Sequence, residues 1–170
     1  MRRPLPALVA LGANLGQPRQ AMAAALQAMA GWPGSRLQAV SGLYASAPVD
    51  AQGPEFLNAV ALLHTPLASH ELLAQLQALE QAAGRERPYR HAPRTLDLDL
   101  LALGDLRLDT PTLTLPHPRL HQRLFVLLPL LELLPDWQVP GLGAAREHAA
   151  TLAGQQALRR LADDPQPWWH

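Results

Sequence analysis

Apolar residues in the first part of the chain follow two different spacings. The apolar run Leu5–Leu11 stops at Gly12–Gly16, which is the pattern of a buried strand followed by a turn. Pro18 suits a first helical position, and Gly31 ends the segment that follows. Between them, apolar residues recur on one helical face: Ala21, Met22, Ala25, Leu26 and Met29. The chain is therefore expected to begin with a strand and a helix.

The next segments repeat this succession of strands and a helix. Leu37–Tyr44 and Phe56–Leu63 are predicted strands, separated by a loop over 47–55 that is rich in Pro, Asp and Gly. A second amphipathic helix, ending at Gly84, presents one apolar face: Leu72, Leu73, Leu76, Leu79 and Ala83. In Thr95–Leu100 leucines alternate with aspartates, so this strand should bury its leucines and expose its aspartates.

Prolines punctuate the remainder of the chain. We expect short extended pieces near Leu106 and Leu113, a proline-rich segment over Pro116–Pro129, a short helix that ends at Leu134, and a last helix around 144–161. The order β, α, β, β, α, β predicts an α+β fold of the ferredoxin-like kind. In it, helices pack on a mainly antiparallel sheet in three layers, α/β/α.

Length and composition fit one domain over residues 1–170, with a core over about 5–162. The tail 163–170 should be loosely ordered, although Trp168 and Trp169 could dock on the body. No apolar run approaches the roughly 20 residues of a membrane helix, and the N-terminus lacks the apolar stretch of a signal peptide. We therefore expect a cytoplasmic protein without a membrane partner.

Cysteine and lysine are both missing from the chain, and each absence excludes a class of chemistry. Without cysteine there is no disulfide, thiolate metal site or cysteine nucleophile. All 14 basic residues are arginine, so Schiff-base chemistry and a P-loop lysine are excluded as well. Any phosphate must therefore be bound by the planar guanidinium group.

Four arginines cluster just before the two aspartates of the alternating strand. Arg85, Arg87, Arg90 and Arg94 precede Asp97 and Asp99, whose carboxylates should project from one face of the strand. Alone, such a pair is more often a solvated strand face. Beside several guanidiniums, however, paired carboxylates that hold Mg²⁺ are what a bound polyphosphate requires. The cluster therefore favours a polyphosphate site.

Two other segments have a superficial likeness to ligand sites. Gly12–Gly16 has neither the spacing nor the lysine of a P-loop, so we interpret it as a structural turn. His117 and His121 have the spacing of zinc ligands on a helix, but Pro116 and Pro118 argue against a helix there. We predict no zinc site.

The segment Ala92–Leu100 resembles a specific family signature. Its residues, Ala-Pro-Arg-Thr-Leu-Asp-Leu-Asp-Leu, are similar to the Gly-Pro-Arg-Thr-Leu-Asp-Leu-Asp motif of the hydroxymethyl-dihydropterin pyrophosphokinases. Further motifs occur in that family's order: Gly12–Gly16, Phe56–Val60, Gly84–Arg87, Pro116–Pro118 and Arg123–Leu127. The similarity spans about Leu8 to Trp137.

This resemblance implies a ferredoxin-like monomer that passes the β,γ-diphosphoryl unit of ATP to a pterin hydroxymethyl group, releasing AMP, in folate synthesis. By that similarity Asp97 and Asp99 hold two Mg²⁺ ions, and Arg85, Arg94 and His117 complete the catalytic group. The residues at ATP-binding positions are Gln77, Glu80, Arg85, Arg87, Arg90, Arg94, His117 and Arg123. Those at pterin-binding positions are Ser46, Ala47, Val49, Phe56, Asn58, His91 and Phe125.

Two alternative hypotheses assign the chain to a different functional class. Ferredoxin-like sheets also bind RNA, but the net charge of zero and 5% aromatic content disfavour a nucleic-acid partner. The second reading is a weak or inactive homologue that serves as a nucleotide, pterin or protein binder. This second hypothesis stays open because the family often has a large aromatic residue at the position of His91 and a glycine at that of Ala92. Ala47 is a further departure, since the family often has proline there. The aspartates and arginines count against it.

Overall fold

An antiparallel sheet of six strands forms the centre of the computed structural model, which describes residues 2–47, 54–84, 96–163 and 166–170. The strand order is β10-β3-β4-β1-β5, and β2 also pairs with β4. The strands are β1 (Leu5–Ala13), β2 (Arg36–Val40), β3 (Tyr44–Ser46), β4 (Phe56–Thr65), β5 (Asp97–Leu103) and β10 (Arg159–Arg160). The long β1 and β4 pair over their full length, from Leu5 opposite Thr65 to Ala13 opposite Leu57.

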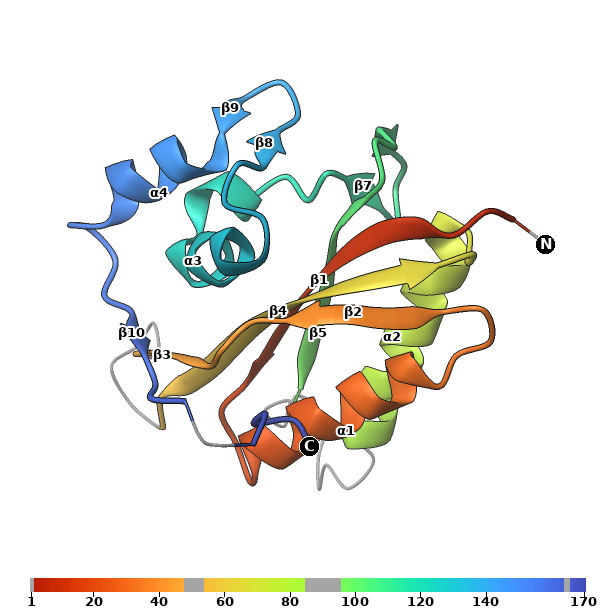
Figure 1. The fold of residues 1–170 in the computed structure, drawn as a ribbon, viewed down its shortest axis with the longest axis horizontal. Helices are drawn as coiled ribbons and strands as arrows, with labels where there is room; N and C mark the ends of the chain where they lie inside the picture. The colour runs from red at the N-terminus through yellow and green to blue at the C-terminus, as the bar shows by residue number, and fades with distance from the viewer. Residues whose placement is uncertain (1, 48–53, 85–95, 164–165) are drawn as a thin grey trace.

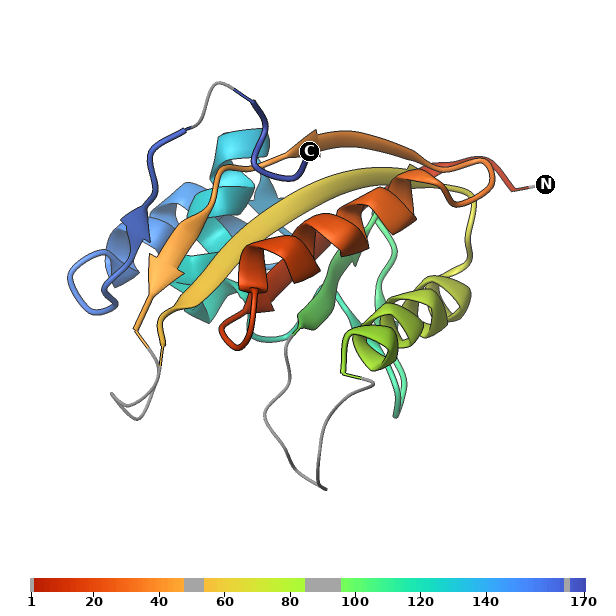
Figure 2. The same ribbon diagram turned by 90° about the horizontal axis from the view of Figure 1, so that it is seen from below.

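Helices cover both faces of this sheet (Figures 1 and 2). Helices α1 (Pro18–Ala30) and α2 (Ser69–Ala83) lie on one face, and α3 (Leu124–Leu133) and α4 (Ala145–Leu152) lie on the other. The predicted α+β, ferredoxin-like fold with three layers is therefore confirmed. Among the described residues, no helix combines the length and apolar character needed to cross a membrane.

Two apolar clusters, one on each face of the sheet, make up the core. Val9 and Leu11 of β1 belong to the cluster under α1 and α2, whereas Leu8 belongs to the cluster under α3 and α4. Successive side chains of a strand point to opposite faces, so a strand covered on both sides needs an unbroken apolar run. This is why Leu5–Leu11 lacks the alternation of a half-exposed strand.

Three predicted elements differ from the structure. The expected strand Leu37–Tyr44 is divided into β2 and β3, since residues 41–43 belong to no strand, and at Gly42 the Arg160 guanidinium occupies the space that a Cβ would need. The helix expected to end at Leu134 begins at Leu124 and includes Pro129. The last helix ends at Leu152, near Gly154, and the residues that follow reach β3 and form β10.

Short elements complete the chain. The extended pieces expected near Leu106 and Leu113 form a hairpin of β6 (Leu108–Asp109) and β7 (Thr114–Leu115). After them come a 3₁₀ turn, η1 (Leu120–Gln122), and a second hairpin, β8 (Gln138–Val139) with β9 (Gly143–Ala144).

The end of the chain contacts the body through its tryptophans. The Trp168 indole N–H donates to the Ser41 carbonyl at 2.8 Å, and the Gln27 amide donates to the Trp169 carbonyl at 3.1 Å. Both indoles pack against the cluster on the α1 face. The docking that the sequence left open therefore occurs for these two residues.

Candidate functional site

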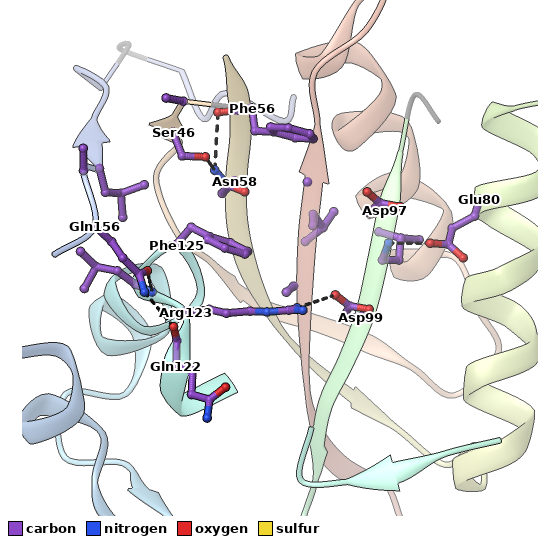
Figure 3. A pocket seen from close by; sticks show the side chains of 18 of the residues that line it. Ser46, Phe56, Asn58, Glu80, Asp97, Asp99, Gln122, Arg123, Phe125 and Gln156 are labelled. Atoms are coloured by element: carbon purple, nitrogen blue, oxygen red, sulfur yellow. Dashed lines mark hydrogen bonds and ion pairs between the residues drawn. The ribbon is translucent and has the colours of Figure 1, made fainter. Parts of the chain in front are cut away.

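A cavity of about 850 Å³ lies at one end of the sheet, between the strands and the start of α3 (Figure 3). Its wall combines strand residues, the start of α3, the inner side of α2 and a stretch just before β10. The lining residues are Ala10, Leu11, Gly12, Ser46, Ala47, Phe56, Asn58, Leu73, Gln77, Glu80, Asp97, Leu98, Asp99, Gln122, Arg123, Leu124, Phe125, Gln156, Ala157 and Leu158. Ten of the residues predicted for the site are among them.

Small residues on β1 form the floor of this cavity. Gly12 lies in register between Asn58 of β4 and Asp97 of β5, and Ala10 lies opposite Asp99. Residues opposite one another on paired strands share a face. The floor between Asn58 and the two aspartates is therefore formed by the two smallest side chains, the hydrogen atom of Gly12 and the methyl group of Ala10. The expected structural turn at Gly12–Gly16 is thus wrong for Gly12, which is a strand residue of the cavity floor.

The two aspartates project from β5 as the alternation predicted. Asp97 is exposed and Asp99 is partly exposed, while Leu98 between them is buried in the cluster on the opposite face. Within the described ranges, no group of three or more His, Asp or Glu side chains is placed to hold a metal ion. A cation beside this pair would need further oxygens from water or substrate, and that donor set fits Mg²⁺.

Arg123 reaches across the floor from the start of α3 (Figure 3). Its Nη1 lies 3.7 Å from Asp99 Oδ2, and its guanidinium carbon lies 5.7 Å from the centroid of the Phe125 ring. The guanidinium therefore stands beside the carboxylate pair with most of its donors still available to an anion.

Glu80 holds the aspartate strand from the side of α2. Its Oε2 accepts a hydrogen bond of 2.9 Å from the Leu98 backbone N–H. Since β5 is an edge strand, this N–H would otherwise have no strand partner. Glu80 thus fixes the peptide between the two aspartates, and Gln77 lines the cavity from the same helix.

Asn58 occupies the opposite end of the cavity. It is 5% exposed, and its amide nitrogen donates to Ser46 Oγ at 2.9 Å and, more weakly, to the Phe56 carbonyl at 3.5 Å. These bonds fix the amide orientation. Phe56 and Phe125 add aromatic rings to this end of the lining. A buried amide between aromatic rings can pair with the edge of a flat heterocycle.

His117 lies just outside the lining, close to the Asp99 end. Burial lowers its pKa below the ordinary value, an effect opposed by the charge of Asp99 and reinforced by Arg123. Its Nδ1 accepts a hydrogen bond of 3.1 Å from the Arg119 backbone N–H. A neutral imidazole that accepts at Nδ1 carries its proton on Nε2, which is then a donor.

Six of the predicted site residues lie outside the described residues: Val49, Arg85, Arg87, Arg90, His91 and Arg94. Conversely, several residues that line the cavity were not predicted from the sequence: Ala10, Leu73, Gln122, Gln156, Ala157 and Leu158. For Ala10 a signal existed, since it shares a strand face with Gly12. The stretch 156–158 gave no such signal because it lies in the segment predicted as helix.

Comparisons with known proteins converge on one family. The family model described as 7,8-dihydro-6-hydroxymethylpterin-pyrophosphokinase (HPPK) matches residues 8–135. A 2-amino-4-hydroxy-6-hydroxymethyldihydropteridine pyrophosphokinase of Pseudomonas aeruginosa is 50% identical over 133 residues, which cover 78% of this chain and 82% of that protein. The protein of the same name from Haemophilus influenzae is 39% identical over 137 residues, covering 80% and 86% of the two chains.

Solved structures show the same fold. The wild-type HPPK-DHPS of Plasmodium falciparum, crystallised with pteroate, superposes with a TM-score of 0.72 at 12% identity, covering 91% of this chain. An HPPK-DHPS in complex with substrates superposes with a TM-score of 0.70 at 11% identity, covering 89% of this chain. This chain spans 44% of the length of each of those proteins.

Proposed function

The chain belongs to the 7,8-dihydro-6-hydroxymethylpterin-pyrophosphokinase family, and we propose that it transfers diphosphate from ATP to 6-hydroxymethyl-7,8-dihydropterin, with release of AMP, in folate biosynthesis. The observation that carries the proposal is a single cavity with two chemically different ends. One end has the buried amide of Asn58 and two phenylalanines, and the other has Asp97, Asp99 and Arg123.

The Asn58 end suits the pterin. A reduced pterin is a flat heterocycle with donors and acceptors along one edge. Asn58 offers it the Oδ1 acceptor, since its Nδ2 already donates to Ser46 Oγ and, more weakly, to the Phe56 carbonyl. Phe56 and Phe125 supply the apolar rings against which such a heterocycle packs. Ser46 holds the Asn58 amide in place, and we propose that Ala47, Val49 and His91 complete this half of the site.

The aspartate end suits the polyphosphate. We propose that Asp97 and Asp99 hold two Mg²⁺ ions, which would neutralise the phosphate oxygens as charge develops on them. Arg123 and the family-matched Arg85, Arg87, Arg90 and Arg94 then clamp the non-bridging oxygens with guanidinium forks. We propose that Gln77 and Glu80, which line the cavity from the adjacent helix, contact the nucleotide.

In the proposed reaction the pterin hydroxyl oxygen attacks the β-phosphorus of ATP. The bond between the β-phosphorus and its bridging oxygen to the α-phosphate breaks, AMP leaves, and the hydroxyl proton passes to solvent. Such a transfer depends on positioning and charge neutralisation, which the proposed pterin and polyphosphate contacts would supply. The Nε2–H of His117 is suited to donate to the α-phosphate or to the bridging oxygen.

We also propose that the protein acts as a cytoplasmic monomer. Light scattering at working concentration tests the monomer, and cell fractionation tests the location.

The experiment that tests the function measures AMP. The purified protein is incubated with ATP, Mg²⁺ and 6-hydroxymethyl-7,8-dihydropterin, and each component is omitted in turn. We expect AMP to form only when all three are present. Pterin and ATP binding without AMP formation would instead favour the inactive homologue, and AMP formation without pterin would indicate simple hydrolysis.

A further inference from the structure

Gln156 makes two side-chain hydrogen bonds that bracket Arg123. Its Oε1 accepts from the Leu124 backbone N–H at 2.9 Å, and its Nε2 donates to the Gln122 carbonyl at 2.9 Å. We propose that Gln156 is a positioning residue, which fixes the backbone on both sides of Arg123 so that its guanidinium meets the polyphosphate of ATP. This inference rests on the proposed function.

The start of α3 needs such a partner. The first N–H groups of a helix have no acceptor within the helix, and they are normally satisfied by a side chain at the N-cap. Here the N-cap residue is Arg123 itself, which makes no capping hydrogen bond with its side chain. Gln156, 32 positions after Leu124, accepts from the first of these N–H groups, that of Leu124.

The second bond extends this control to the peptide before Arg123. With the Gln122 carbonyl and the Leu124 N–H both held by one amide, the two peptide planes that flank the Arg123 Cα are tied to each other. These planes set the direction in which the side chain leaves the backbone. Figure 3 shows Gln156 beside Gln122 and Arg123, and the Arg123 side chain extending from there toward Asp99.

Gln156 is itself anchored on the sheet. Just after it, Arg159 and Arg160 pair with Ala45 and Tyr44 of β3. The Arg160 Nε donates to Glu132 of α3 at 2.9 Å. The segment that carries Gln156 is thereby attached both to the sheet and to the far end of the helix that it caps, so it can act as a fixed support.

Loss of this support should weaken ATP binding. At about 1.4 kcal/mol per tenfold in affinity, a 5- to 20-fold loss corresponds to roughly 1–1.8 kcal/mol, which is the scale of one or two lost hydrogen bonds. Gln156 lies beyond residues 8–135, where the family model matches, so its role is inferred from these contacts alone.

The test is a double-mutant cycle read by calorimetry of a non-hydrolysable ATP analogue with Mg²⁺. Gln156→Ala should raise the Kd by about 5- to 20-fold. The same change in an Arg123→Ala background should have less than about a twofold effect, because coupled residues are non-additive. Gln155→Ala, a change at the exposed neighbouring residue, is the matched control and should leave the Kd within about twofold.

Gln156→Met gives a second entry into the cycle, since it keeps the length of the side chain, adds no charge and loses both hydrogen bonds. It should raise the Kd about as much as Gln156→Ala, and it replaces Gln156→Ala if that variant does not fold. An unchanged Kd in both variants, or an equal loss with and without Arg123, would overturn the inference. If the parent still releases AMP, such a result leaves the proposed function intact, whereas a parent that binds no ATP analogue overturns both.

Discussion

Replacing Asp99 by asparagine should separate the catalytic role of this carboxylate from its structural role. The Arg123 ion pair is 3.7 Å long, with side-chain exposures of 28% and 46% for Arg123 and Asp99. Pairs this exposed contribute about 0.2–1 kcal/mol to stability. Loss of the pair is offset in part, because one of two neighbouring negative charges on β5 is removed. We therefore expect the free energy of unfolding to change by less than about 1 kcal/mol.

Activity should respond much more strongly to Asp99→Asn. Metal stabilisation of the transition-state charge is worth several kcal/mol, and each roughly 1.4 kcal/mol is tenfold in rate. A loss of about two to four orders of magnitude in kcat/KM is expected. Chemical denaturation and the AMP assay, run on the same preparation, measure the two effects.

Asp105→Asn is the matched control, because Asp105 is an exposed aspartate in the turn after β5. It should leave both stability and turnover unchanged. The reasoning is refuted if Asp99→Asn retains turnover within a few-fold of the parent, or if it destabilises the protein by several kcal/mol without Mg²⁺. Either result would make Asp99 a structural residue of the strand.

Three further substitutions probe the rest of the cavity. Asn58→Ala should weaken pterin binding by roughly 1–3 kcal/mol and leave ATP binding nearly unchanged, as measured by separate calorimetric titrations. Equal losses of affinity for both ligands would show that Asn58 has a structural role. Ala10→Leu should fill the floor and lower affinity for at least one substrate by about tenfold or more while the protein stays folded, as checked by calorimetry and thermal melting. Glu80→Ala should lower the free energy of unfolding by about 1–2 kcal/mol in chemical denaturation, because the Leu98 N–H loses its acceptor. Glu80→Gln keeps an acceptor for this N–H, so its free energy of unfolding should fall by less in the same experiment.

The local part of the site was predictable from sequence because a strand has a period of two. Alternation in Thr95–Leu100 was enough to place both aspartates on one face and the leucines on the other. The helical spacing of apolar residues predicted the buried face of α1 equally well, since Met22, Leu26 and Met29 are fully buried. In each case the signal lay within a few consecutive residues.

Features that depend on contacts between distant segments were not predictable in the same way. Gly12 lies between Asn58 and Asp97 only because three strands pair in one register, and no pattern within β1 specifies that register. Gln156, Ala157 and Leu158 are residues that tolerate a helix well. Pairing of the following Arg159 and Arg160 with β3 overrides that tendency, and it places Gln156 at the cavity.

The measurement that tests the central claim most directly follows the phosphates themselves. ATP labelled on both the β- and the γ-phosphate is incubated with the protein, Mg²⁺ and 6-hydroxymethyl-7,8-dihydropterin, and the products are separated. A pyrophosphokinase should yield a pterin product that carries both labels in equal amounts, together with one unlabelled AMP per product. Transfer of the γ-label alone with release of ADP, or release of labelled diphosphate that does not depend on the pterin, would contradict the account.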